Sequence, residues 1–311
     1  MKKCTKLLLA LGAAVAAPII INHKITKKAA ERITQRENES IYNWDYGDIR
    51  YLTAGDADAP PMLLVHGIYP GAGALEYKNV LDLFAKDYRV YAIDMLGFGY
   101  SDKPNATYSA YLYVSLIKEF IDDIIGKPVT AVASLHSAAA LVACAKLNPD
   151  DFTKLLLISP TGTTDFVEMA ADVDGYVNKV FGSPVFGTSF YHALVSKKAL
   201  PEFFDKEGLC GKLDCETLDE FYLSAHAHGA GGKYPIAALI AKHFNTDIKK
   251  MLDELTIPFN IITGDIQPTS SGFGVWRGLG ENTPTSLVED AHLLPHLDKP
   301  DEFYALAKEL L

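Results

Sequence analysis

The segment from Val129 to Pro160 constrains the fold more than any other part of the chain. It predicts a short apolar strand, a turn, a helix of small residues and a second apolar strand. Two neighbouring parallel strands need a crossover of a dozen or more residues, usually a helix, and this segment supplies one. It therefore predicts a parallel β-sheet with at least one helix packed on a face.

The same alternation continues on both sides of this segment. Further apolar strands are predicted at residues 49–53, 62–65, 89–93, 259–263 and 286–288, with helices at 76–85, 108–125 and 301–311. Continuous apolar strands separated by helices indicate an α/β protein with a mostly parallel sheet and helices on both faces.

The alternation stops between residues 165 and 253, where the pattern is helical, rich in aromatic residues and without a convincing strand. A helical insertion between two sheet strands is expected to cover the carboxyl ends of the strands, where such sheets bind ligands. We therefore expect a core of residues 42–164 and 254–311, interrupted by a helical lid of residues 165–253.

The N-terminus is an apolar run between lysine-rich flanks. Residues 7–21 carry no charge, as in a secretory signal. As a helix this run would span about 22 Å, short of the ~30 Å of a hydrocarbon core. We expect residues 1–22 to be an uncleaved membrane anchor or a cleaved signal, and 23–41 a polar linker. The protein would then be membrane-associated through its N-terminus or secreted; a soluble protein with an apolar N-terminal helix is the alternative.

Charge and composition restrict the partners. The net charge of −10 argues against nucleic acid, because phosphate contacts need clustered lysine and arginine. We expect no metal, because His226 and His228 lack a third ligand and Pro295 separates His292 from His296. No dinucleotide-binding glycine motif follows a predicted strand, so we expect no cofactor. Nothing in the sequence indicates an oligomeric state.

Four motifs occur in a familiar order. They are Val65-His66-Gly67-Ile68, the loop from Asp94 to Ser101, the turn from Val132 to Ala138, and the segment from Leu294 to Phe303. Together they resemble the α/β-hydrolase superfamily, in its lid-bearing form, over residues 42–311. The resemblance implies a nucleophile, a histidine, an acid and an oxyanion hole, the last formed by the backbone N–H groups of Ile68 and His136.

The turn places Leu135 in the nucleophile slot of that family. Residues two before and two after a nucleophile must be small because backbones crowd there, and Ala133 and Ser137 satisfy this around Leu135. A turn centred on Ser134 would put the larger Val132 at one of these places. Ser137 and, as second choice, Ser134 are the candidate nucleophiles if the turn is shifted; if it is not, no nucleophile is present.

The resemblance also suggests the base and the acid. His292 is the candidate base, although one extra residue separates it from Pro295 compared with the family pattern. The usual position of the acid after the seventh strand is occupied by Gln267, so Asp265, two residues earlier, is the candidate acid. Asp165, after the sixth strand, is an alternative.

Three functions are compatible with these residues. The first is hydrolysis of a small apolar ester or amide through a non-standard serine site. The second is a catalytically inactive protein that binds a small apolar or amphipathic molecule under an aromatic lid. The third is serine-independent chemistry in which His292 acts as a base.

Overall fold

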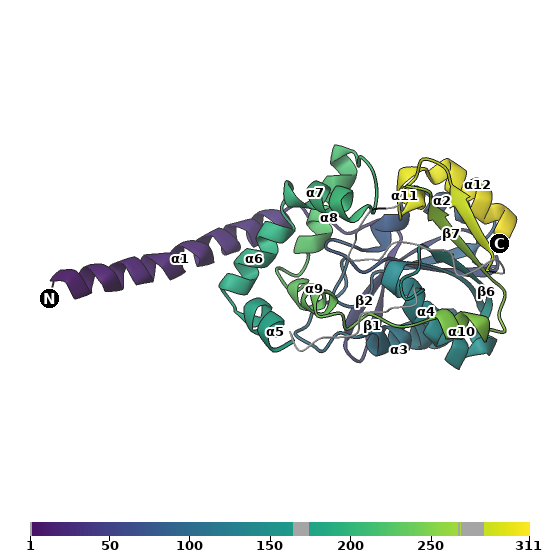
Figure 1. The fold of residues 1–311 in the computed structure, drawn as a ribbon, viewed down its shortest axis with the longest axis horizontal. Helices are drawn as coiled ribbons and strands as arrows, with labels where there is room; N and C mark the ends of the chain where they lie inside the picture. The colour runs from purple at the N-terminus through teal and green to yellow at the C-terminus, as the bar shows by residue number, and fades with distance from the viewer. Residues whose placement is uncertain (1, 164–173, 267, 269–282) are drawn as a thin grey trace.

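An eight-stranded sheet organises the molecule (Figure 1). The computed structural model describes residues 2–163, 174–266, 268 and 283–311. The strand order is β1-β2-β4-β3-β5-β6-β7-β8, in which β1–β2 and β2–β4 are antiparallel and all other pairs are parallel. The strands are β1 (Glu39–Trp44), β2 (Gly47–Ala54), β3 (Pro61–Val65), β4 (Arg89–Ile93), β5 (Val129–Ser134), β6 (Phe152–Ile158), β7 (Phe259–Gly264) and β8 (Thr285–Val288).

The prediction of an α/β fold with a mostly parallel sheet is confirmed. Each of the seven predicted strands is present, with ends that differ by a few residues at most. The sequence pattern did not reveal β1. This strand pairs only with β2, so it lies at the edge of the sheet. It alternates buried and exposed residues instead of forming a continuous apolar run, as expected for an antiparallel edge strand.

Helices cover both faces of the sheet, as predicted. On one face α3 (Ala110–Phe120) and α4 (Leu135–Leu147) belong to the larger apolar core. On the other face α2 (Leu81–Phe84) and α12 (Pro300–Leu310) contribute to a second core. Successive residues of β5 alternate between the two, since Ala131 and Ala133 belong to the first core and Val132 to the second. Burial on both faces explains why this strand is mostly apolar.

A group of helices is inserted between β6 and β7, and we call it the inserted helices. It comprises α5 (Asp174–Gly182), α6 (Phe186–Leu194), α7 (Ala199–Glu207), α8 (Cys215–His226), α9 (Lys233–Ile240) and α10 (Lys249–Asp253). No strand lies among the described residues of this segment. In Figure 1, α5, α6, α7, α8 and α9 lie at the end of the sheet from which α1 projects, and α10 lies beside α4.

The N-terminal helix α1 (Lys2–Ala30) extends beyond the rest of the molecule (Figure 1). It continues past residue 22, where the sequence suggested a change from anchor to linker. Its C-terminal part contacts α6 and α8, with Asn22 and Ala29 buried there. Among the residues that the structure describes, we find no helix with the length and apolar character needed to cross a membrane.

The loop after β4 is built around the buried carboxylate of Asp94. This carboxylate accepts hydrogen bonds from the backbone N–H groups of Ala74 (2.6 Å) and Tyr100 (2.8 Å) and from the guanidinium of Arg36 (2.6 Å). Gly99 has a φ of +55°, and a Cβ atom there would lie 2.0 Å from the Asp94 carboxyl carbon. The motif therefore requires glycine at this position for two independent reasons.

We expect Gly99→Ala to lower the free energy of unfolding by about 3 kcal/mol, from the positive φ and the clash with Asp94 together. Gly126→Ala is the matched control, because Gly126 has a φ of +66° but a Cβ atom there would meet no other atom within 4 Å. The control substitution should lower the free energy of unfolding by about 1 kcal/mol. Equal losses in urea unfolding would contradict the steric role of Gly99.

Candidate active site

The strand-to-helix turn between β5 and α4 has a strained backbone. Strand β5 ends at Ser134 and α4 begins at Leu135, which has a φ of +52°. A left-handed conformation at a leucine costs roughly 1–2 kcal/mol and persists only where surrounding contacts enforce it. The Leu135 side chain is fully buried, and its carbonyl accepts a hydrogen bond from the Thr161 N–H (3.3 Å) after β6.

The His66-Gly67-Ile68 turn packs directly against this strained turn. A Cβ atom on Gly67 would lie 3.0 Å from the Leu135 Cδ1 atom and 3.0 Å from the Ser134 Oγ atom. Ile68 is buried next to it. The family resemblance assigned the backbone N–H groups of Ile68 and His136 to an oxyanion hole. The structure brings the two segments that carry them, the Gly67 turn and the start of α4, into contact.

The buried carboxylate of Glu76 joins these turns, although the sequence analysis did not select it. Its Oε2 atom accepts from the Gly67 N–H (2.8 Å) and the Tyr69 hydroxyl (2.7 Å). Its Oε1 atom accepts from the Ser134 hydroxyl (2.6 Å) and contacts the His296 Nε2 atom at 2.9 Å. We call these five residues the Glu76 network.

The electrostatics of the network favour an ionised Glu76. Burial by itself raises the pKa of this carboxyl, but the hydrogen bonds from His296 and Ser134 and the field of His296 outweigh burial, so the pKa is lowered. Burial, together with the nearby Glu76 charge, raises the pKa of the Tyr69 phenol well above its usual value. Tyr69 is therefore a neutral donor to an anionic carboxylate.

His292 is paired with Asp298, six residues further along the chain. The His292 Nδ1 atom lies 2.5 Å from the Asp298 Oδ2 atom, and the His292 N–H donates to the same oxygen (2.8 Å). The other oxygen accepts from the Gly211 N–H (2.7 Å) and the Cys210 thiol (3.1 Å). Burial raises the pKa of Asp298, but hydrogen bonds from Cys210, His292 and Gly211 outweigh it and lower the pKa.

The remaining predicted site residues lie in different surroundings. Asp265 is exposed just after β7, and the carboxylate that holds His292 is that of Asp298 instead. Ser137 is fully buried in α4, and within the described part of the chain its hydroxyl has no hydrogen-bond partner. Asp165 and Gln267 lie outside the described residues. The catalytic roles suggested for Ser137, Ser134, His292 and Asp265 stay predictions.

Two histidines near the turn are held as neutral rings. Burial lowers the pKa of His136 to about 4, and its Nε2 atom lies 3.2 Å from the Asn245 Oδ1 atom. Burial also lowers the pKa of His66, whose Nε2 atom accepts from the Met95 N–H at 3.0 Å. Since that nitrogen is an acceptor, the Nδ1 atom carries the proton and donates to the Gly67 carbonyl (2.6 Å).

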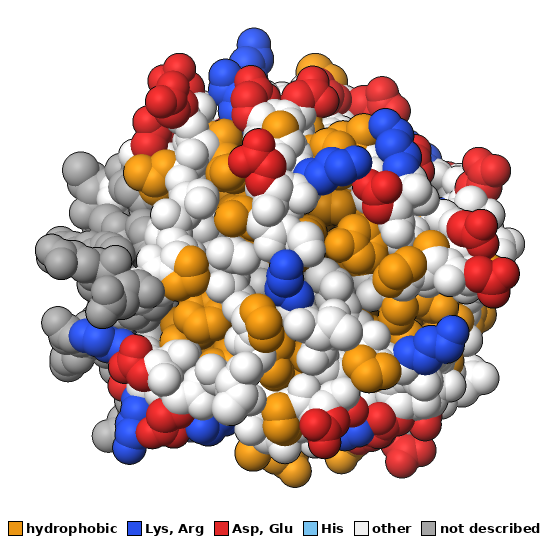
Figure 2. All heavy atoms as spheres, turned by 90° about the vertical axis from the view of Figure 1, so that its right-hand side faces the viewer, with side chains coloured by type: hydrophobic (Ala, Val, Ile, Leu, Met, Phe, Trp, Pro, Cys, Tyr) orange, Lys and Arg blue, Asp and Glu red, His pale blue; other side chains and the backbone are white. Residues whose placement is uncertain are grey.

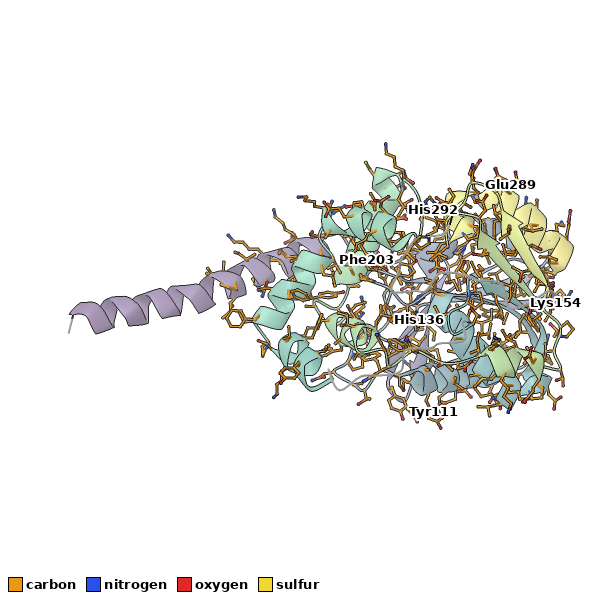
Figure 3. The ribbon with its side chains drawn as sticks, in the orientation of Figure 1. Tyr111, His136, Lys154, Phe203, Glu289 and His292 are labelled. Carbon is orange, nitrogen blue, oxygen red and sulfur yellow. The ribbon has the colours of Figure 1, made fainter. Side chains whose placement is uncertain are left out.

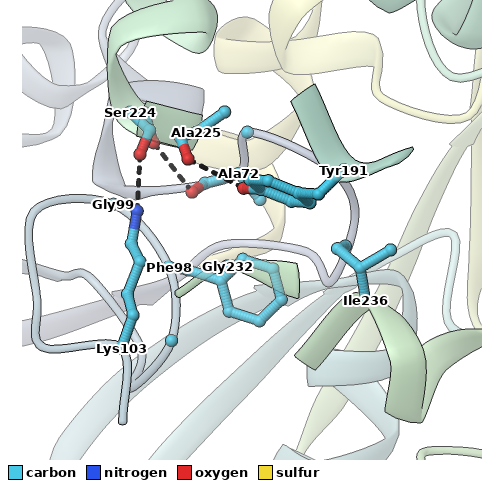
Figure 4. Close-up of a pocket in the computed structure, with 11 residues that line it drawn as sticks. Ala72, Phe98, Gly99, Lys103, Tyr191, Ser224, Ala225, Gly232 and Ile236 are labelled. Carbon is cyan, nitrogen blue, oxygen red and sulfur yellow. Dashed lines mark hydrogen bonds between the residues drawn. The ribbon is translucent and has the colours of Figure 1, made fainter. Parts of the chain in front are cut away.

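A small pocket lies between the Asp94 loop, α8 and α9 (Figure 4). The Lys103 ammonium donates to the Ser224 carbonyl (2.6 Å), and the Tyr191 hydroxyl donates to the Ala225 carbonyl (2.7 Å). Burial lowers the pKa of Lys103 to about 7. The pocket does not admit a water molecule, so it is a packed junction between the core and the inserted helices and not a ligand site.

A larger cavity of about 430 Å³ lies between the loop before α3 and helices α5 and α9. Its lining combines polar and apolar groups, from Asn105, Ala106, Thr107, Tyr108, Phe181, Gly182, Tyr234, Ala237, Ala238 and His243. His243 is two residues from Asn245, which contacts His136 at the start of α4. The cavity is in the size range of small-molecule sites.

Within the described residues no group of three or more potential ligands could hold a metal ion.

The fold and the arrangement of these turns are those of an α/β hydrolase. The model of the Alpha/beta hydrolase family matches residues 62–306. The chain therefore belongs to the α/β-hydrolase family, as its motifs suggested.

Individual relatives agree with this assignment. The chain is 32% identical over 162 residues to 2-hydroxy-6-oxo-6-(2'-aminophenyl)hexa-2,4-dienoic acid hydrolase of Metapseudomonas resinovorans, covering 49% of this chain and 53% of that protein. It is 37% identical over 78 residues to a haloalkane dehalogenase of Mycobacterium marinum, covering 24% of this chain and 26% of that protein. The chain thus spans about half, or less, of the length of these curated relatives.

Solved structures share the fold over most or all of the chain. A membrane phospholipase A, described as a bacterial virulence factor, superposes with a TM-score of 0.67 at 18% identity, covering 100% of this chain and 98% of that chain. At this identity the likeness establishes the fold alone.

Two functional candidates escaped the sequence analysis, Glu76 and Asp298. A glutamate at the start of a predicted helix is usually a solvated residue, and only the buried Gly67, Ser134 and His296 around it reveal its role. Asp298 lies within the motif around His292, but it was not assigned a role because the family pattern directs attention to the end of β7.

We expect Glu76→Gln to lower the free energy of unfolding by roughly 3 kcal/mol at neutral pH, because it leaves buried donors poorly matched. The pKa of Glu76 is lower in the folded than in the unfolded protein. Its contribution is therefore complete above the unfolded value, about 4.3, and is lost as pH falls through the folded pKa. The difference between wild type and Glu76→Gln should shrink in that range.

Glu289→Gln is the control, because Glu289 is exposed on the surface near β8 (Figure 3). It should change stability by less than about 0.5 kcal/mol at every pH. Denaturant unfolding of the three proteins between neutral and acidic pH makes the comparison. A constant gap between wild type and Glu76→Gln down to the most acidic point would contradict an ionised Glu76.

Proposed function

We propose that this protein is an α/β-hydrolase-fold protein without a serine nucleophile, which binds a small apolar or amphipathic molecule. The observation that carries the proposal is Leu135, which occupies the strained turn between β5 and α4 with a φ of +52°. An alkyl side chain cannot form a covalent intermediate, whatever base stands beside it.

The two nearby serines support the same conclusion. The Ser134 hydroxyl donates to the buried Glu76 carboxylate at 2.6 Å, so its proton is held by an anion within the Glu76 network. The Ser137 hydroxyl is buried in α4, with no hydrogen-bond partner in the described residues. A nucleophilic serine needs a base within hydrogen-bond reach. The Ser134 hydroxyl is bound to Glu76 and the Ser137 hydroxyl has no partner among the described residues, so the base candidate His292 activates neither in this structure.

The cavity of about 430 Å³ is the ligand site in this proposal. Its lining is mixed: Phe181, Tyr234 and the alanines of α9 would contact an apolar part of the ligand, while Asn105 and Thr107 provide polar groups that would orient a polar part. The ligand class is thus a small amphipathic molecule.

A second candidate function is hydrolysis of a small apolar ester or amide through Ser137. One observation favours it: the His292–Asp298 pair and the Gly67–Ile68 turn are retained at the same edge of the sheet. The name of the Metapseudomonas resinovorans relative, a hydrolase, agrees with such a role. For this function α4 would have to shift to present Ser137.

We expect the wild-type chain to remain unlabelled by a fluorophosphonate probe and to leave nitrophenyl acetate unhydrolysed above background. Leu135→Ser should gain labelling and at least about tenfold more esterase activity, because it puts a hydroxyl at the strained turn. Adding His292→Ala should return the rate to the wild-type background, as expected for loss of a general base.

Ser137→Ala in the wild-type background is the matched control for this experiment. Labelling of the wild type that disappears in Ser137→Ala would overturn the proposal and establish the second candidate. A folded Leu135→Ser protein that never labels would contradict the assignment of residue 135 to the nucleophile slot.

We expect Ala238→Trp to weaken binding of the uncharged fluorescent probe N-phenyl-1-naphthylamine by about tenfold or more, because the indole would fill the cavity. Ala57→Trp, at an exposed position, is the control and should leave binding unchanged. Titration of each variant with the probe gives the dissociation constants. Equal affinities in the two variants would mean that the cavity is not the ligand site.

A further inference from the structure

A group of large apolar side chains is exposed where α1 leaves the body of the protein. They come from α1, α5 and α6, and their exposed fractions lie between 49% and 62%. We call them the apolar collar: Ile19, Ile20, Ile21, Val180, Phe186 and Phe190. Single exposed apolar residues are ordinary, but a contiguous group of this kind marks an interaction site.

Hydrogen bonds from Asn22 join α1 to α6 next to the collar residues. The Asn22 side chain donates to the Val185 carbonyl (3.2 Å) and to the Ser189 hydroxyl (3.0 Å). Val185 and Ser189 are the chain neighbours of Phe186 and Phe190. The three isoleucines directly precede Asn22, within one helical turn. The apolar stretches of the two helices are therefore close in space, although the three consecutive isoleucine side chains point about 100° apart around α1.

Helix α5 continues the same surface. The Phe190 ring packs edge-on against the Phe181 ring with centroids 5.3 Å apart. A Cβ atom on Gly187 would lie 2.5 Å from the Val180 carbonyl oxygen, so α5 and α6 approach closely there. Val180 thus extends the collar beyond Phe190.

The direction of α1 is fixed relative to the collar. Arg32, just after α1, forms an ion pair with Asp219 on α8, and Thr26 contacts His192 on α6 at 3.4 Å. Ala29 is buried at this junction. Because several contacts along its C-terminal part hold the helix, its apolar N-terminal part leaves the protein directly beside the collar (Figure 1).

Basic side chains lie next to the collar residues on α1 and on α5. Lys24 and Lys28 are exposed on α1 after the isoleucines, and Lys179 is exposed on α5 next to Val180. Lys27 is also exposed and lies 3.9 Å from Glu31. An apolar surface with a basic border matches the hydrocarbon and anionic headgroups of a lipid bilayer, even though the net charge of the chain is −10.

The end of the molecule opposite α1 has a different distribution of charged side chains. Figure 2 shows that end, where acidic side chains lie mostly around the margin, basic ones lie both at the margin and near the centre, and apolar side chains lie between them. Acidic side chains are as prominent there as basic ones, so that end does not offer the basic border that the collar has.

We infer that α1, α5 and α6 together form a bilayer-binding surface, in which the collar enters the lipid interface and the lysines contact anionic headgroups. The inserted helices then bind lipid themselves, in addition to the N-terminal segment. The inference is independent of whether the site hydrolyses a substrate.

Tryptophan quenching tests the contact directly in the full-length protein. Phe186→Trp and Phe190→Trp would each be mixed with phosphatidylcholine–phosphatidylglycerol vesicles whose acyl chains carry bromine, which quenches tryptophan on contact. In both variants we expect more quenching of tryptophan fluorescence than in the wild-type protein, which has two tryptophans of its own. Tyr111→Trp is the matched control, because Tyr111 is 76% exposed on α3, away from α1 (Figure 3). Equal quenching at all three positions, or none at Phe186 and Phe190, would overturn the inference.

A charge variant provides the second measurement. Phe186→Asp combined with Phe190→Asp should lower the fraction of protein that floats with the vesicles by about tenfold, whereas Tyr111→Asp should not lower it. Circular dichroism would verify that both variants are folded. If the double variant instead converts a dimer into a monomer and floats like the wild type, the collar binds a second copy of the chain, and the bilayer inference is wrong.

Discussion

The arrangement of the candidate site depends on one buried anion, the carboxylate of Glu76. Four donors surround it, from the Gly67 turn, Tyr69, the end of β5 at Ser134 and helix α11 (Pro295–Asp298) at His296. A fully buried carboxylate is costly unless it is paired and hydrogen-bonded, so the network is stable only when these segments are all in place. Segments that are far apart in sequence are thereby held at the same edge of the sheet.

This network holds the turn at Leu135, the residue that the proposed function places in the nucleophile slot. The left-handed backbone of Leu135 is strained, and its neighbours enforce it: Ser134 is bound to Glu76, Gly67 packs against the side chain, and Thr161 holds the carbonyl. None of these contacts needs a hydroxyl at position 135. The scaffold and the chemistry are therefore separable here, and function must be argued from the site and not from the fold.

The sequence predicted the features that arise from long apolar patterns and missed those that arise from tertiary contacts. Strands such as β3 and β5 are buried on both faces, so their apolar runs were visible; β1 is an alternating edge strand and was not. The small residues around Leu135 indicated the strained turn, because crowding there is local. Asp298 could not be selected in the same way, since its pairing with His292 depends on the short helix α11 folding back and on Cys210 and Gly211 from the loop between α7 and α8.

The inserted helices link the candidate site to the proposed bilayer-binding surface. At one end, the Leu293 and Leu294 N–H groups donate to the Gly208 and Leu209 carbonyls, and the Gly211 N–H holds Asp298, so the segment between α7 and α8 fixes the loop of His292. At the other end, α8 holds Arg32 through Asp219, and α6 holds α1 through Asn22. Helix α8 takes part in both junctions, because it follows the segment that contacts His292 and carries Asp219. A continuous series of direct contacts therefore runs from α1 and the collar through α8 to the loop that carries His292.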